Sequence, residues 1–127
     1  MIYARIVLSL SALMYGGFGA AYLARPKAMA KLTHFELTSP TAVTEIRAFY
    51  GGMELGLAAL LIACAIRPEW AGAGLLALAL LSGGTVVARL VGFAADGSAT
   101  AFLWKILAAE VLVAGLGVVG LVLLRRT

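Results

Sequence analysis

The chain alternates four long apolar runs with short polar breaks. Each run approaches the ~20 residues that an α-helix needs to cross a bilayer. A helix suits such a run because it satisfies all of its own backbone hydrogen bonds, which lipid cannot do. We therefore expect transmembrane helices over residues 6–24, 46–66, 70–94 and 101–124. The pattern predicts an all-α fold, a transmembrane four-helix bundle formed by a single domain, residues 1–127.

Proline, glycine and capping residues mark the ends of these runs. Arg25-Pro26 and Arg67-Pro68 end the first two runs, because the residue before a proline disfavours helix. Ser39-Pro40 is typical of an N-cap followed by a first-turn proline, so the second helix is expected to begin ahead of its apolar run. Asp96-Gly97-Ser98 predicts a tight turn, in which Gly97 ends the third helix and Ser98 caps the fourth.

The one long connection covers residues 26–38, between the first two spans. Lys27 and Lys31 fall on one side of a helical projection, and the apolar residues Met29, Leu32 and Phe35 fall on another. This separation is typical of a short helix lying on the membrane surface. An ordinary loop is the alternative.

The distribution of basic residues gives only a weak preference for one orientation of the spans in the membrane. Four spans place both chain ends on one side, and basic residues divide almost evenly between the two sides. Arg125 and Arg126, at the end of the chain, favour cytoplasmic termini. The motif Ala28-Met29-Ala30 resembles the cleavage site of a signal peptide, but Arg25 and Lys27 separate it from the first apolar run. We therefore expect the first run to be a retained membrane span and not a signal peptide.

Composition agrees with a membrane protein and excludes several function classes. Hydrophobic residues make up 63% of the chain and charged residues 13%, whereas soluble domains average roughly half and about a quarter. The net charge is +4, but the bases sit at the ends of apolar runs. They therefore suit membrane lipids as partners, and no nucleic acid is expected. A single cysteine, Cys64, and a single histidine, His34, exclude an internal disulfide and two-histidine haem ligation. No metal and no cofactor are expected.

Ionisable residues inside the apolar runs are the candidates for function. Each costs roughly 2.5–3.5 kcal/mol in a span by insertion scales, so such residues are functional hypotheses by default. At the rise of a helix, all of them fall in the half of the bundle that carries the 26–38 connection. These residues are Arg47, Glu54, Arg89, Lys105 and Glu110.

Helical spacing groups these charges on faces that would point inward. Arg47, Tyr50 and Glu54 follow the spacing i, i+3, i+7 in the second span. Arg89 continues a stripe of small and polar residues in the third span. We expect Glu54 to meet Arg89, and Arg47 or Arg89 to reach Glu110. The stripe around Arg89 consists of Ser82, Thr85, Gly92 and Asp96, whereas Lys105 falls off the Glu110 face and is expected to snorkel.

These faces predict a polar cavity rimmed by Tyr15, Tyr22 and Tyr50. Two alternatives remain open from the residues alone. The glutamates and arginines could simply staple the helices together and fix their register, or they could carry an ion or a proton.

Two sequence elements carry a resemblance to a known group of proteins. One is Glu45-Ile46-Arg47-Ala48-Phe49-Tyr50-Gly51-Gly52-Met53-Glu54-Leu55-Gly56. The other is Ala88-Arg89-Leu90-Val91-Gly92, followed by Asp96-Gly97 and by Glu110 in the last span. Together they resemble a family of small bacterial four-span membrane proteins without an assigned function. The resemblance implies a protein of the bacterial inner membrane and supplies no reaction.

The leading hypothesis is a site for a small polar, anionic or lipid-like ligand. Arg47 and Arg89 would hold its head, Glu54 and Glu110 would orient them, and Tyr15 and Tyr50 would border the tail. An intramembrane isomerase or lyase, with Glu54 or Glu110 as the acid or base, is the main alternative. A proton-coupled transporter and a subunit of a larger complex are others, and a homo-oligomer is compatible with each.

Overall fold

The structure is a computed structural model that describes residues 1–127, and its regular elements are all helices. Four helical segments are long and apolar enough to cross a membrane: Ile2–Ala24, Pro40–Ile66, Pro68–Asp96 and Ala101–Arg125. The all-α prediction is confirmed, and so is the expectation of four helices long and apolar enough to cross a membrane; the protein is a multi-pass membrane protein. The second and third segments begin before their apolar runs, because Pro40 and Pro68 occupy the first turn of a helix.

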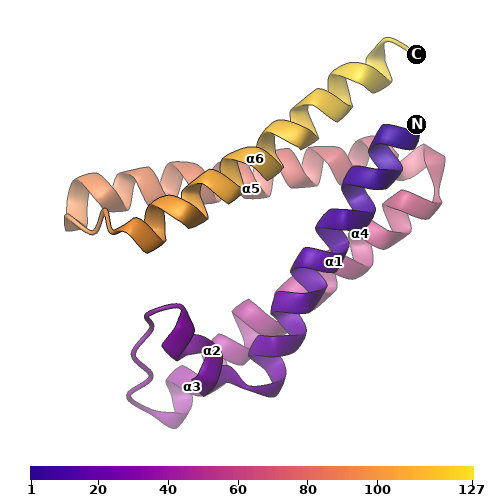
Figure 1. Ribbon diagram of the computed structural model, residues 1–127. Helices are drawn as coiled ribbons and strands as arrows, with labels where there is room; N and C mark the ends of the chain where they lie inside the picture. The colour runs from indigo at the N-terminus through magenta and orange to yellow at the C-terminus, as the bar shows by residue number, and fades with distance from the viewer. The chain divides into compact units, whose positions relative to one another are not determined.

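Eight helical elements make up the chain (Figure 1), and the second span is built from three of them in succession. The connection between the first two spans contains a short helix, so the alternative of an ordinary loop is wrong there. Whether this helix lies on a membrane surface stays a prediction. The elements are α1 (Ile2–Ala24), α2 (Pro26–Leu32), α3 (Pro40–Ile46), the π-helical η1 (Arg47–Gly52), α4 (Met53–Ile66), the 3-10 helix η2 (Pro68–Trp70), α5 (Ala71–Asp96) and α6 (Ala101–Arg125).

The sequence predicts capping residues at three helix ends, and two of these predictions are confirmed. The Ser39 hydroxyl accepts a hydrogen bond from the Ala42 amide at 3.1 Å and so caps α3. Gly97 ends α5 with a φ of 64°, in the left-handed region that glycine adopts without strain. The prediction that Ser98 caps the fourth span is wrong. Thr100 has the extended backbone of an N-cap and accepts from the Leu103 amide at 3.4 Å.

The chain divides into two compact units, which we describe separately. Residues Ser9–Ala63 form what we call the α1–α4 unit, and Met1–Leu8 with Cys64–Thr127 form the α5–α6 unit. The boundaries between them fall inside the helices α1 and α4. That the chain acts as a single domain stays a prediction.

In the α1–α4 unit, glycines bring α1 against η1 and α4, which run antiparallel to it. A Cβ atom on Gly19 would lie 2.9 Å from the Gly51 carbonyl oxygen and 3.0 Å from the Leu55 side chain. A Cβ on Gly51 would in turn lie 3.1 Å from the Leu23 amide nitrogen. The helices therefore touch through their backbones, and α2 and α3 lie at one end of the pair (Figure 1).

In the α5–α6 unit, two long antiparallel helices pack along their length. Leu75 and Leu78 of α5 are completely buried. A Cβ on Gly117 of α6 would lie 2.9 Å from the Leu75 carbonyl oxygen, so these helices also meet backbone to backbone. The Tyr3 hydroxyl donates to the Leu116 carbonyl at 3.0 Å, which ties the first turn of α1 to α6.

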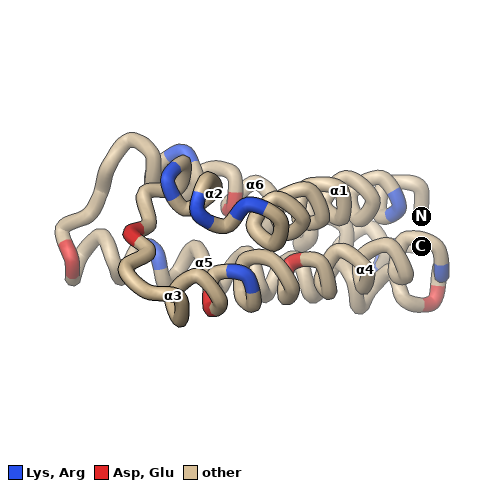
Figure 2. The backbone as a smooth tube through the Cα atoms, turned by 90° about the horizontal axis from the view of Figure 1, so that it is seen from below, with Lys and Arg blue, Asp and Glu red and all other residues tan.

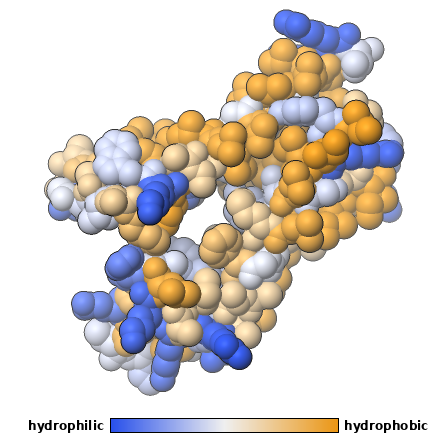
Figure 3. All heavy atoms as spheres, viewed as in Figure 1, coloured by the Kyte–Doolittle hydropathy of each residue, from blue (hydrophilic) through white to orange (hydrophobic).

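The surface of the long helices is suited to lipid. Charged residues are sparse along them (Figure 2), and apolar side chains cover most of their visible surface (Figure 3). Leu13 of α1 is 72% exposed and Leu80 of α5 is 65% exposed. Hydrophilic side chains gather instead over the end of the α1–α4 unit that carries α2 and α3 (Figure 3).

Candidate functional site

The first cluster of charged residues is an ion pair between α5 and α6. Arg89 Nε donates to Glu110 Oε2 at 3.0 Å, and Arg89 Nη2 donates to Glu110 Oε1 at 2.7 Å. Two parallel bonds of this kind fix the orientation of both side chains. The side chains are only 24% and 22% exposed, so the pair is largely enclosed by the unit. Each charge neutralises the other, and this is one of the pairings that the sequence leaves open.

The polar stripe of α5 is satisfied by the helix itself next to this pair. The Thr85 hydroxyl donates to the Ser82 carbonyl at 2.8 Å, one turn back along α5. Ser82 is buried, with 2% of its surface exposed. Such back-bonding lets a hydroxyl remain in an apolar span without another partner. Asp96 is the last residue of α5, at the turn that Gly97 completes.

In the α1–α4 unit, Arg47 caps the end of α1. Its Nη1 donates to the carbonyl oxygen of Leu23 at 2.8 Å. The last four carbonyls of a helix lack an intrahelical donor, and Leu23 is the penultimate residue of α1. A cation at a helix C-terminus also interacts favourably with the helix dipole. Arg47 therefore has a structural partner, although the residue as a whole is exposed.

Three aromatic side chains form a cluster in the same unit. Tyr22 is 3% exposed and donates from its hydroxyl to Thr33 Oγ1 at 2.7 Å. The Tyr50 ring lies 5.2 Å from the Tyr22 ring and 5.3 Å from the Phe35 ring, measured between centroids. The Thr33 hydroxyl in turn donates to the Met29 carbonyl at 2.8 Å. This aromatic cluster, Tyr22, Phe35 and Tyr50, joins α1 and η1 to the connection after α2.

Glu54 stands at the start of α4, one turn beyond the aromatic cluster. It is half-buried and close enough to Tyr22 for an electrostatic interaction. Unlike Glu110, it forms no ion pair and no hydrogen bond within its unit. Gly52 and Gly56, two residues before and after Glu54, lie on the opposite face of the helix. That face is open, since a Cβ on Gly56 would meet no atom within 4 Å and one on Gly52 only the Arg47 carbonyl oxygen, at 3.9 Å.

The π-helical segment η1 connects Arg47 to Glu54. Its wider hydrogen-bonded turn is seen in the bond from the Met53 amide to the Ala48 carbonyl. Such segments are rare and occur frequently at functional sites. The Gly51-Gly52 pair within it has weak helix propensity, and Gly51 packs against the backbone at Leu23. The sequence pattern, read at the period of an α-helix, does not predict this segment.

The predicted site residues thus fall into two groups. Tyr15, Arg47, Tyr50 and Glu54 belong to the α1–α4 unit, and Arg89 and Glu110 belong to the α5–α6 unit. The expected contacts of Glu54 with Arg89 and of Arg47 with Glu110 would join the units and stay predictions. Lys105 is exposed on α6.

Sequence reasoning missed one residue of the site, Thr33, which lies in the connection between the first two spans, where no periodicity marks it. Phe35 was expected on the apolar side of the short helix and instead follows α2, in the aromatic cluster. No group of three or more His, Cys, Asp or Glu side chains is placed to hold a metal ion.

Comparison with known proteins gives one match. The family model of a domain of unknown function, DUF4345, matches residues 3–121, which include both groups of site residues. The chain has no significant match among the curated proteins or the solved structures.

Proposed function

The chain belongs to the DUF4345 family of domains of unknown function, and we propose that it binds a small polar or lipid-like ligand within one half of its membrane spans. The observation that carries the proposal is Glu54. It is a half-buried carboxylate in an apolar span with no ion pair or hydrogen bond in its unit. A charged group in a span is costly and is retained where it has a partner or a function.

Glu54 lacks an ion pair and a hydrogen bond in its unit, whereas three other charged residues of the spans each have a partner. Arg89 and Glu110 neutralise each other through two hydrogen bonds, and Arg47 uses one donor on the Leu23 carbonyl. A ligand that donates a hydrogen bond to Glu54 would stabilise its carboxylate in the span. The remaining donors of Arg47 suit an oxygen or anionic group on the same ligand, and the aromatic cluster offers an apolar wall for its body.

Native mass spectrometry of gently extracted protein tests this proposal. We expect a discrete bound mass on the wild type and its loss in Glu54→Gln. The matched control is Glu45→Gln, which makes the same change on exposed α3 and should keep the ligand. Equal retention by both variants, or no bound mass on the wild type, would contradict the proposal. The same spectra report a homo-oligomer, and a stoichiometric protein partner in place of a small mass would indicate a subunit of a larger complex.

A second candidate function is acid–base catalysis on a lipophilic substrate, of the isomerase or lyase type. It is favoured by the difference between the two span glutamates, because only Glu54 is outside an ion pair. A general acid or base must exchange its proton with a substrate, and the two bonds from Arg89 occupy both oxygens of Glu110. Incubation of the extracted ligand class with wild-type protein and Glu54→Gln would reveal a chemical change that depends on Glu54. An unchanged ligand would leave binding alone.

We propose the bacterial inner membrane as the location, with both termini in the cytoplasm. The sequence resemblance supports the membrane, and Arg125 in the last turn of α6 supports the orientation. At the same side, the Arg67 guanidinium lies 4.5 Å from the centroid of the Trp70 ring. An arginine stacked on a tryptophan is suited to an interfacial anchor. Reporter fusions to the C-terminus that are active only in the cytoplasm or only outside it would distinguish the two orientations.

A further inference from the structure

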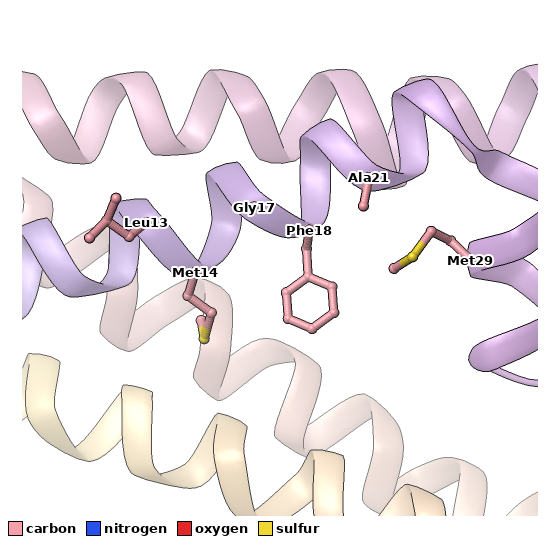
Figure 4. Close-up of a pocket in the computed structure, with 6 residues that line it drawn as sticks. All are labelled: Leu13, Met14, Gly17, Phe18, Ala21 and Met29. Carbon is pink, nitrogen blue, oxygen red and sulfur yellow. The ribbon is translucent and has the colours of Figure 1, made fainter.

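An apolar groove runs along α1 and ends at α2 (Figure 4). Its volume is about 360 Å³, and its lining contains no charged side chain. Phe18 of α1 and Met29 of α2 project into the same space (Figure 4). Gly17 leaves the middle of the groove open, since a Cβ there would meet no atom within 4 Å. The lining residues are Leu13, Met14, Gly17, Phe18, Ala21 and Met29.

Basic residues lie at the α2 end of this groove. Met29 lines the groove, and Lys27 and Lys31 lie on the other side of the same short helix, with Arg25 immediately before it. All three basic residues are exposed, and the α2 region appears as a group of blue segments in Figure 2. α2 itself carries no acidic residue; the acidic residues of the neighbouring segment are Glu36 and Glu45, both exposed.

We propose that this groove binds an anionic phospholipid of the surrounding bilayer. An acyl chain would lie along α1 within the span Ile2–Ala24, and the headgroup phosphate would lie among the basic residues at α2. The apolar lining suits a hydrocarbon chain, and each Lys or Arg near an anionic headgroup adds about 1 kcal/mol of attraction.

Charge favours a lipid over a second copy of the chain in this groove. Two copies inserted with the same orientation would bring their Lys27 and Lys31 residues to the same membrane surface, side by side. Like charges would then repel each other, whereas an anionic headgroup neutralises them. The lipid site does not depend on the proposed ligand at Glu54, because the two share no residue.

Lipid titration followed by native mass spectrometry tests the proposal. Delipidated protein in mild detergent is titrated with phosphatidylglycerol or with phosphatidylcholine. We expect one tightly held phosphatidylglycerol on the wild type and weaker binding of phosphatidylcholine. Gly17→Leu fills the groove and should remove the tight site. The matched control is Gly115→Leu on α6, which also enters open space and should retain the site.

Two further measurements make the outcome decisive. The double variant Lys27→Gln/Lys31→Gln should keep the groove and lose the preference for phosphatidylglycerol, by about fivefold for each lysine. Unchanged preference would overturn the choice of an anionic lipid. If Gly17→Leu binds phosphatidylglycerol as the wild type does, the site itself is refuted. If Gly17→Leu lowers the unfolding midpoint well below that of Gly115→Leu, the groove is filled by protein and the proposal fails.

Discussion

Substitution of Gly19 by alanine is expected to force α1 away from η1 and α4. The new Cβ would lie 2.9 Å from the Gly51 carbonyl oxygen and 3.0 Å from both the amide nitrogen and the side chain of Leu55. Two of these atoms belong to the backbone and cannot rotate away. To reach an ordinary contact of 3.4 Å, the helices must separate by about half an ångström. Overpacking of this kind costs roughly 1–3 kcal/mol.

Gly17→Ala is the matched control, because the new methyl group would meet no atom within 4 Å. Both substitutions remove a glycine from the same helix, so the gain in helix propensity of about 1 kcal/mol is common to them. Gly19→Ala should therefore be less stable than Gly17→Ala by roughly 1–3 kcal/mol. The α5–α6 unit offers an independent repeat with Gly117→Ala, whose Cβ would lie 2.9 Å from the Leu75 carbonyl oxygen, against Gly115→Ala in open space.

Unfolding by SDS in mixed micelles, followed by circular dichroism, measures these differences. The midpoint for Gly19→Ala should fall below those of the wild type and Gly17→Ala. If Gly19→Ala proves as stable as Gly17→Ala, the close approach of α1 to η1 is incorrect, and with it the geometry of the candidate site in this unit.

Two other substitutions test the polar contacts. Arg89→Met should destabilise the protein by about 3 kcal/mol, because it leaves the Glu110 carboxylate unpaired in a largely enclosed position. The double variant Arg89→Met/Glu110→Met should recover most of this stability in the same unfolding assay. A double variant as unstable as the single one would argue against the ion pair. Tyr22→Phe removes the hydrogen bond to Thr33 and should lower the stability of the protein by about 1 kcal/mol. Proteases should then cut the connection after α2 more readily. Cleavage at the wild-type rate would mean that this bond does not hold the connection in place.

The helices of this protein follow from its sequence, because the length of an apolar run is decided by the bilayer and not by the details of packing. Ser39 and Gly97 were predictable for local reasons as well, since the Ser39 hydroxyl can accept a hydrogen bond from the first turn of a helix and Gly97 adopts a left-handed backbone that few other residues tolerate. Ser98 and Thr100 are both good N-caps. The choice between them depends on where the backbone leaves the turn after Gly97, and no residue type encodes that point.

The site was predictable in its residue types and less so in its contacts. The cost of charge in lipid singles out Arg89 and Glu110, but helical phase allows Glu110 either arginine as a partner, and only the approach of α5 to α6 selects Arg89. The contact of Arg47 is with a backbone carbonyl, which has no side-chain signature. One signal was available: Pro26 ends α1 and leaves carbonyls such as that of Leu23 in need of a donor.

The π-helical turn of η1 makes the length of this stretch as important as its composition. It contains one residue more than an α-helical turn would use over the same rise. If the same residues formed a continuous α-helix instead, everything before this stretch would rotate by about 100° relative to α4. Arg47 would then turn away from Leu23, although every side chain named in the site would still be present. A helix without the π-helical turn would keep the charges of this protein and lose their arrangement.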